Sequence, residues 1–175
     1  QLPLRVLCGA TGSAKTRVLQ ALAIAGEQVL DLEDLAAHKG SVLGGWPGRP
    51  QPSQKAFETQ LAAQLKAFDL TRPVYVEAES RRIGRITLST ALLERLRASP
   101  CIEIAATAPA RLAHLLHDYA YLGDDGEALA AQIGLLHGLQ ANETLERWQA
   151  WARQHQLPLL FEELMRLHYD PLYAR

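Results

Sequence analysis

The chain has 175 residues, of which 48% are hydrophobic and 21% are charged, and its formal net charge is −1. This composition is typical of a globular protein and excludes a disordered or fibrous chain. No run of about 18 apolar residues is present, so no membrane-spanning helix is predicted. With so little net charge, any nucleic-acid partner must be bound by a local basic patch.

The length predicts a single domain over residues 1–175, with a sheet portion over about 1–108 and a helical tail over about 109–175. Cys8 and Cys101 lack a metal-ligand spacing and predict no disulfide framework, which favours a cytoplasmic location. The first residue is Gln1 rather than Met. We therefore expect a piece of a longer protein, cut close to the start of its first strand.

The first half of the chain alternates between predicted strands and helices. Residues 4–8 form an apolar run that ends at Gly9, as expected of a buried parallel strand. Helical apolar spacing follows over 18–25, again over 57–68 after Ser53, and over 92–96. Further strands are predicted over 28–32, 73–77 and 101–106. This alternation predicts an α/β fold with a parallel sheet flanked by helices.

Two other segments differ from this alternation. Residues 40–52 contain four glycines and three prolines, which predicts a long irregular loop of the kind that is usually functional. From Pro109 to the end, the apolar residues recur only at helical spacing, which predicts a helical C-terminal tail.

Residues 9–16, GATGSAKT, nearly match a phosphate-binding loop, which is Gly, four residues, then Gly-Lys-Ser/Thr. Such a loop aims backbone N–H groups at an anion, and Lys15 would reach the outer phosphates. Ala14 replaces the usual glycine, and we expect its methyl group to be tolerated only at negative φ. The predicted phosphate-binding residues are Gly9, Thr11, Gly12, Ser13, Ala14, Lys15 and Thr16.

Charged residues follow the predicted strand 73–77, at the edge where α/β folds bind ligands. Glu77 and Glu79 are candidates for organising Mg²⁺ or water, or else they cap the next turn and pair with neighbouring arginines. Arginines at 81, 82 and 85 suit phosphate groups. Further candidates for this edge are His38, Lys39, Ser41 and Lys55. The six histidines show no metal-ligand spacing.

Several segments, taken in order, resemble the C-terminal P-loop domain of bacterial tRNA 2-selenouridine synthase. These segments are GATGSAKT, GEQVLDLEDLAAHKGSVLGG, QPSQKAFE, PVYVEAESRRIG and YDPLY. The resemblance covers nearly the whole chain and implies a P-loop NTPase-like fold. The family pattern has glycine at position 14 and arginine at position 39, so Ala14 and Lys39 depart from it. Ala14 weakens the expectation of efficient nucleotide hydrolysis, and Lys39 keeps the charge without the bidentate geometry of arginine.

The resemblance implies a transferase that replaces sulfur by selenium in wobble 2-thiouridine of tRNA. Geranyl diphosphate would first alkylate the sulfur, and selenophosphate would then supply selenium as the geranylthio group leaves. It also implies an N-terminal rhodanese-like domain, which this chain lacks.

On this reading the P-loop holds phosphate groups of substrates, and Lys15, Arg81 and Arg82 are the expected catalytic residues. The expected substrate or tRNA contacts are His38, Lys39, Ser41, Arg85, Tyr169 and Tyr173. No cofactor is expected beyond Mg²⁺. A small-molecule kinase or NTPase, and a non-catalytic tRNA-binding module, remain alternatives.

Overall fold

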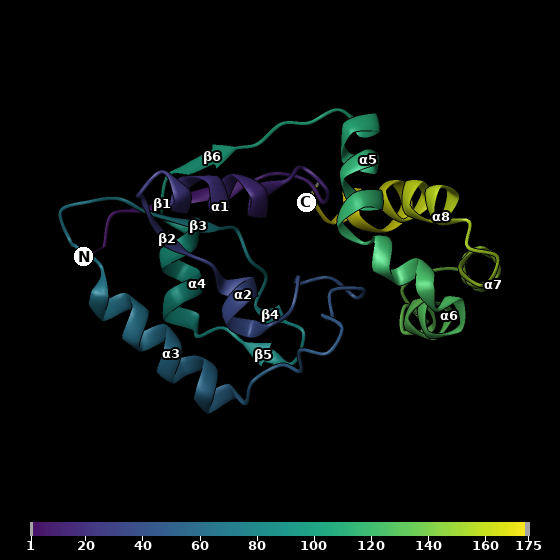
Figure 1. Ribbon diagram of the computed structural model, residues 1–175, viewed down its shortest axis with the longest axis horizontal. Coiled ribbons are helices and arrows are strands. Elements are labelled where there is room, and N and C mark those ends of the chain that lie inside the picture. The colour runs from purple at the N-terminus through teal and green to yellow at the C-terminus, as the bar shows by residue number, and fades with distance from the viewer. Residues whose placement is uncertain (1, 174–175) are drawn as a thin grey trace. The chain divides into compact units, whose positions relative to one another are not determined.

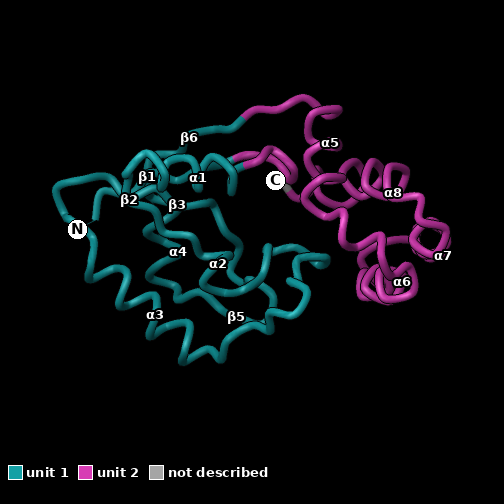
Figure 2. The backbone as a smooth tube through the Cα atoms, viewed as in Figure 1, with its two compact units in different colours: residues 1–8, 15–104 teal, residues 9–14, 105–175 magenta. Residues whose placement is uncertain are grey.

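The computed structural model describes residues 2–173. Its ribbon is shown in Figure 1. The chain divides into two compact units (Figure 2). The first comprises residues 1–8 and 15–104, and the second comprises residues 9–14 and 105–175. The second unit therefore takes six residues from near the start of the chain.

The first unit contains a four-stranded parallel sheet in the order β2-β3-β1-β6. Its strands are β1 (Leu4–Cys8), β2 (Gln28–Leu30), β3 (Val74–Glu77) and β6 (Cys101–Glu103). Leu4 pairs with Val74 and Leu7 with Glu77, so the carboxyl ends of β1 and β3 lie level. The predicted α/β fold with a parallel sheet flanked by helices, of the P-loop NTPase type, is confirmed.

Four helices belong to this unit: α1 (Lys15–Ile24), α2 (Leu32–Ala36), α3 (Gln54–Ala67) and α4 (Thr90–Arg97). Apolar residues of α3 and α4, among them Phe57 and Leu93, share one buried cluster with Val6 and Val76 of the sheet. Burying a side chain such as Phe57 contributes about 2–3 kcal/mol. Figure 1 shows α1 on the other side of the sheet from α4. Ser53 caps α3 by accepting from the Ala56 N–H at 3.2 Å, as its position predicts.

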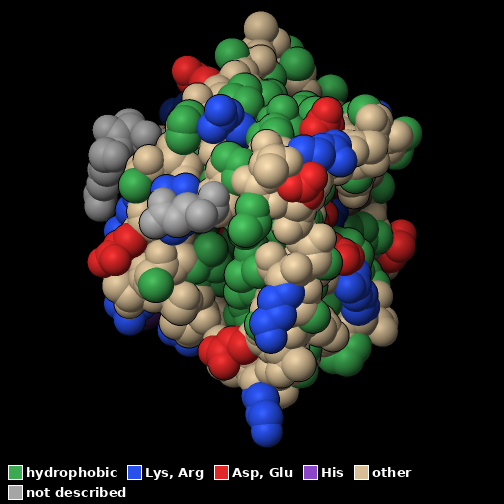
Figure 3. All heavy atoms as spheres, turned by 90° about the vertical axis from the view of Figure 1, so that its left-hand side faces the viewer, with side chains coloured by type: hydrophobic (Ala, Val, Ile, Leu, Met, Phe, Trp, Pro, Cys, Tyr) green, Lys and Arg blue, Asp and Glu red, His purple; other side chains and the backbone are tan. Residues whose placement is uncertain are grey.

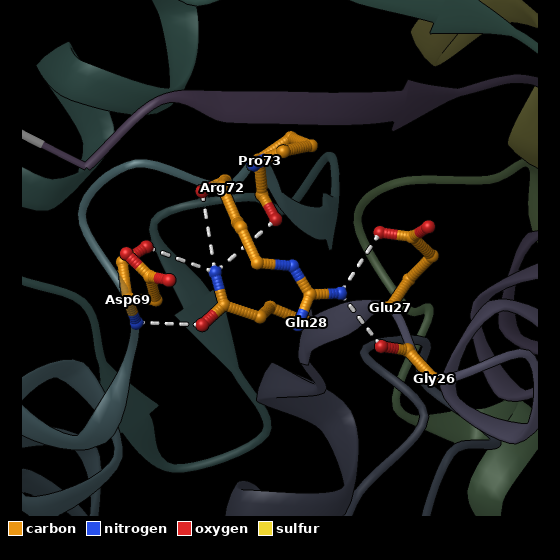
Figure 4. Close-up of polar contacts among 6 residues, drawn as sticks. All are labelled: Gly26, Glu27, Gln28, Asp69, Arg72 and Pro73. Carbon is orange, nitrogen blue, oxygen red and sulfur yellow. Dashed lines mark hydrogen bonds and ion pairs between the residues drawn. The ribbon is translucent and has the colours of Figure 1, made fainter.

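The amino ends of β2 and β3 are held together by one side chain, Gln28 (Figure 4). Its Nε2 donates to the carbonyls of Asp69 and Arg72 at 3.0 and 3.2 Å, and its Oε1 accepts from the Asp69 N–H. Arg72 in turn donates to the Gly26 carbonyl at 2.8 Å and pairs with Glu27. These contacts satisfy the backbone where two strands begin, at the end of the sheet opposite the candidate site.

Two predicted strands end earlier than expected, and one hairpin was not predicted. The predicted strand over 28–32 ends at Leu30, because Asp31 accepts from the Asp34 N–H at 2.8 Å and starts α2. The predicted strand over 101–106 ends at Glu103. Residues after β3 form an unpredicted hairpin of β4 (Arg82–Ile83) and β5 (Ile86–Thr87), whose turn contains Gly84 at φ +57°. The irregular loop predicted over 40–52 contains no helix or strand, as expected.

The prediction that the cysteines form no disulfide was wrong. Cys8 and Cys101 are joined in the structure, with their Cα atoms 6.1 Å apart. They meet because β1 and β6 are adjacent parallel strands, although 93 residues separate them in the chain. The two cysteines therefore give no support for a reducing compartment.

The second unit is helical after residue 105, as predicted for the tail. Its elements are α5 (Ala108–Asp118), η1 (Ala120–Asp124), α6 (Gly126–Gly134), α7 (Asn142–Arg153), α8 (Leu157–Leu164), the π-helical η2 (Met165–Tyr169) and α9 (Asp170–Tyr173). Trp148 is fully buried, and its indole N–H donates to Glu163 at 2.9 Å. No helix within residues 2–173 is long and apolar enough to cross a bilayer.

Candidate functional site

Residues 9–14, which follow β1, form a glycine-rich loop segment in the second unit. Gly9 and Gly12 have φ values of +151° and +82°, which glycine adopts without strain. The Ser13 N–H donates to the Ala10 carbonyl at 3.1 Å and closes a tight turn. The Ser13 hydroxyl is buried without a hydrogen-bond partner in the described chain, a state that a bound anion would relieve.

The conformation of Ala14 contradicts the expectation that its φ is negative. Ala14 has φ +64°, in the left-handed region. Glycine adopts this conformation without strain, whereas Ala14 bears the steric cost of its methyl group. That cost is about 1–2 kcal/mol for an L-residue. Ala14 therefore differs from the glycine of the motif in its side chain, while its φ lies in the region that glycine favours.

Lys15 and Thr16, the next residues along the chain, open α1 in the first unit. A helix start presents unpaired backbone N–H groups and a partial positive charge, both of which favour anions. The Thr16 hydroxyl lies 3.5 Å from Glu33 Oε2. Lys15 also acts electrostatically on the carboxyl groups nearby, lowering the pKa of Glu33, Glu77 and Glu79 against other effects.

Three carboxyl groups of the first unit form a carboxylate cluster: Glu33 from α2, Glu77 at the end of β3, and Glu79 just beyond it. One oxygen of each lies within 4.8 Å of the others. Glu77 is only 4% exposed, and its Oε1 has no hydrogen-bond partner in the described chain. Gly40, at φ +69°, packs against the cluster so closely that a Cβ there would lie 3.3 Å from both Glu33 and Glu79.

This crowding keeps the cluster from ionising fully. Burial raises the pKa of Glu33 to about 9, and the neighbouring Glu77 and Glu79 add to the rise. Burial and then Glu77 raise the pKa of Glu79 to about 8. Burial also raises the pKa of Glu77, against the effects of Thr16 and Lys15. The cluster therefore binds protons near neutral pH, and a divalent cation could take their place.

The predicted arginines have two different roles in the structure. Arg81 and Arg82 are exposed on the β4–β5 hairpin, and their guanidinium groups make no hydrogen bond or ion pair to another described residue. Arg85 instead donates to the backbone carbonyls of Gln51 and Pro52. Gln51 also accepts from the Arg85 N–H at 2.9 Å. Arg85 therefore ties the hairpin to the preceding loop, whereas Arg81 and Arg82 are available to a phosphate.

His38 lies beside this hairpin rather than among exposed cations. Its Nδ1 accepts from the Gly40 N–H at 3.1 Å, and burial lowers its pKa. A Cβ at Gly44 would lie 3.0 Å from its ring, and one at Gly84 would lie 2.8 Å from it. The imidazole is therefore a neutral packing element between two glycine-bearing segments. Ser41 has a buried hydroxyl without a partner in the described chain, and Lys39 is half-buried.

The predicted tyrosines belong to the C-terminal tail. Tyr169 is half-buried, and its ring centroid lies 4.9 Å from that of His168, in edge-to-face contact. The side chain of Tyr173 falls outside the described residues. Between them in sequence, Asp170 forms a bidentate ion pair with Arg111 of α5, and Arg111 donates from Nε to the Thr11 carbonyl at 2.8 Å. Neither Arg111 nor Asp170 is among the site residues predicted from the sequence.

Charge is mixed on the face of the molecule shown in Figure 3. Lysine and arginine side chains (blue) alternate there with aspartate and glutamate (red) and with hydrophobic side chains (green). This face offers no broad basic surface.

Comparison with known proteins extends over most of the chain. Residues 2–144 match the family described as the tRNA 2-selenouridine synthase AAA domain. The tRNA 2-selenouridine synthase of Marinobacter nauticus is 41% identical over 97% of this chain and 52% of its own length. That of Nitrosomonas europaea is 36% identical over 86% of this chain and 40% of its own, and that of Nitrosomonas eutropha is 39% identical over 74% and 34%. The chain thus spans about a third to a half of the length of these relatives.

Proposed function

Because the chain belongs to the tRNA 2-selenouridine synthase family, whose AAA domain it matches over residues 2–144, we propose that it is the phosphate-handling part of such an enzyme. In this proposal the full-length enzyme replaces sulfur by selenium in wobble 2-thiouridine of tRNA. A rhodanese-like domain elsewhere in the full-length protein completes it. Because the proposed substrate is a tRNA, the enzyme would act in the cytoplasm.

The observation that carries this proposal lies within the first unit, where Lys15 and Thr16 of an anion-binding motif lie beside a cation-binding cluster at the start of α1. Lys15 and Thr16 follow a glycine-rich loop whose left-handed turns are preserved even at Ala14. The carboxylate cluster lies against Thr16 and contains a buried oxygen, Glu77 Oε1, that has no hydrogen-bond partner among residues 2–173. Phosphate groups bridged to a divalent cation need both kinds of group at one place.

The residues present fit Mg²⁺, since carboxylate oxygens are its preferred protein ligands. In this proposal Glu33, Glu77 and Glu79 hold the ion, which would neutralise charge that develops on a departing phosphate group. Lys15 provides a positive charge, and the Thr16 hydroxyl lies beside the Glu33 carboxylate. Lys15 and the loop N–H groups then stabilise the leaving diphosphate electrostatically, an effect that can contribute several kcal/mol.

Geranyl diphosphate and selenophosphate both fit this chemistry. In the first step the thiocarbonyl sulfur attacks the allylic carbon of geranyl diphosphate, and the carbon–oxygen bond breaks to release diphosphate. In the second, the selenium of selenophosphate attacks the pyrimidine carbon and the geranylthio group leaves as geranylthiol; water then cleaves the phosphorus–selenium bond and releases inorganic phosphate. Arg81 and Arg82 are proposed to bind selenophosphate or the tRNA backbone, because their guanidinium groups are exposed and uncommitted. Neither step requires hydrolysis of a nucleotide.

The test is a calorimetric titration of the chain with geranyl diphosphate, selenophosphate, ATP and GTP, each with and without Mg²⁺. Tighter binding of geranyl diphosphate or selenophosphate than of either nucleotide, strengthened by Mg²⁺, supports the proposal. Mg²⁺-stimulated ATP or GTP turnover without tRNA would instead show a kinase or NTPase. Binding of tRNA without any response to the phosphate ligands would show a non-catalytic tRNA-binding module.

A further inference from the structure

Arg111 is one of the few charged residues buried in the described chain. Its side chain is 9% exposed, and a guanidinium group stays charged at any physiological pH. Burial of an unpaired charge is costly, so its partners define its role. Those partners are the Asp170 carboxylate, at 2.5 and 3.3 Å, and the Thr11 carbonyl, at 2.8 Å. All three residues belong to the second unit.

The contact with Thr11 fixes the direction of a peptide group in the glycine-rich loop segment. The described chain contains no cis peptide bond, so the Thr11 carbonyl and the Gly12 N–H point in opposite directions. Holding the carbonyl toward Arg111 therefore turns the Gly12 N–H away from α5. That N–H donates no hydrogen bond within the described residues, so it is available to an incoming acceptor.

The packing around Gly12 supports the same orientation. A Cβ at this position would lie 3.0 Å from the Arg111 carbonyl oxygen and 3.0 Å from Leu115 Cγ. The backbone of the loop thus rests directly on the turn of α5 that carries Arg111. With φ at +82° and no room for a side chain, Gly12 presents its N–H from a backbone that is fixed on one side.

We propose that Arg111 and Asp170 form a positioning pair, which holds the Thr11 carbonyl against α5 and so aims the Gly12 N–H at an oxygen of a bound phosphate group. The inference rests on the proposed function, because it assumes that residues 9–16 bind phosphate. It gives a role to Asp170 of the YDPLY segment, which the chemistry of the substrates does not explain. Asp170 acts through Arg111 and touches no substrate.

The test uses inorganic pyrophosphate as the probe and the 175-residue chain in every variant. Asp170→Asn removes the charge from a partly exposed position while keeping its size, so this variant should fold. We expect its dissociation constant for pyrophosphate to rise about tenfold or more, as for loss of a charge-assisted contact. Asp170→Glu, which keeps the charge, should recover most of the affinity. Glu127→Gln, which breaks an exposed ion pair with Arg153 on neighbouring helices, is the matched control and should bind as the unmodified chain does.

The Gly12 amide resonance in ¹⁵N-labelled protein separates positioning from general support of the fold. Asp170→Asn should shift this resonance before any ligand is added, and pyrophosphate should move it far less than in the unmodified chain. Glu127→Gln should leave both properties unchanged. An unshifted Gly12 resonance together with unchanged affinity in Asp170→Asn overturns the inference. So does a loss of affinity that merely parallels a lower melting temperature while the Gly12 resonance stays in place.

Lys15→Ala distinguishes failure of the inference from failure of the proposed function. If Lys15→Ala weakens pyrophosphate binding and Asp170→Asn does not, the positioning pair is refuted while phosphate binding stands. If neither the unmodified chain nor any variant binds pyrophosphate, the proposed function fails. In that case the ligand-free Gly12 resonance still tells whether Asp170 controls the peptide orientation.

Discussion

Replacing Ala14 with glycine should stabilise the protein, which is unusual for a mutation to glycine. Ala14 has φ +64°, where the Cβ of an L-residue costs about 1–2 kcal/mol. Glycine removes that cost but also gives the unfolded chain more freedom, which offsets about 0.4–1 kcal/mol. The net gain in the free energy of unfolding therefore lies within about 0–1.6 kcal/mol, with a central value of about 0.8 kcal/mol. For a chain of this size, that gain raises the melting temperature by roughly 1–4 °C.

Urea unfolding followed by circular dichroism measures this gain directly. Ala10→Gly is the matched control, because Ala10 lies in the same loop without a positive φ. That variant gains only the unfolded-state entropy and should lose about 0.4–1 kcal/mol. The reasoning is refuted if Ala14→Gly destabilises the chain as much as Ala10→Gly does. Such a result would mean that the left-handed conformation at position 14 is not populated in solution.

Three further predictions follow from the candidate site. Lys15→Ala should weaken pyrophosphate binding by about 1.5–3 kcal/mol. Calorimetry measures this loss, and Lys66→Ala, at an exposed position, is the control. Equal affinities of the two variants would exclude a phosphate contact at Lys15. With a chelator present, the free energy of unfolding should fall between about pH 5 and pH 9. In the folded chain the pKa is raised to about 9 for Glu33 and to about 8 for Glu79, whereas in the unfolded chain both return to the ordinary value of 4.5, so the folded state loses stability as the pH rises. Glu79→Gln should therefore make stability depend less steeply on pH, and Mg²⁺ should counteract the loss of stability. Finally, the logarithm of the affinity for tRNA should fall linearly with the logarithm of the salt concentration, with a slope magnitude of roughly 3 to 5. Changing Arg81 and Arg82 to alanine should reduce this slope by about one unit per lost phosphate contact. Unchanged slopes would exclude the hairpin as a tRNA contact.

The sheet and the long helices could be predicted because their signals are local. The apolar run over residues 4–8 and the spacing from Phe57 onward depend only on near neighbours. Helix α2 was missed because the apolar residues before it extend the strand pattern, and one capping contact at Asp31 decides the boundary. The hairpin after β3 was missed because its strands contain only two residues each.

The candidate site was only half predictable for a different reason. Glu77 and Glu79 could be identified because they follow an obvious strand. Glu33 joins them only because β2 lies beside β3 in the sheet. The order of strands in a sheet cannot be inferred from the spacing of residues near one another in the sequence. A carboxylate directly after the predicted strand over 28–32 was the available signal. Arg111 and Asp170 lie 59 residues apart and gave no signal before the fold was known.

The division drawn in Figure 2 also bears on how the protein is synthesised and folds. Residues 9–14 emerge from the ribosome long before the helices with which they form one unit. Until α5 follows, the Thr11 carbonyl lacks its guanidinium partner, which lies 100 residues further along the chain. Closing a loop of that length costs about 4 kcal/mol of chain entropy, so the contact should form late. We therefore expect this hexapeptide to be synthesised well before the helices of its unit and to become ordered only after they follow, and no single cut can separate the two units intact.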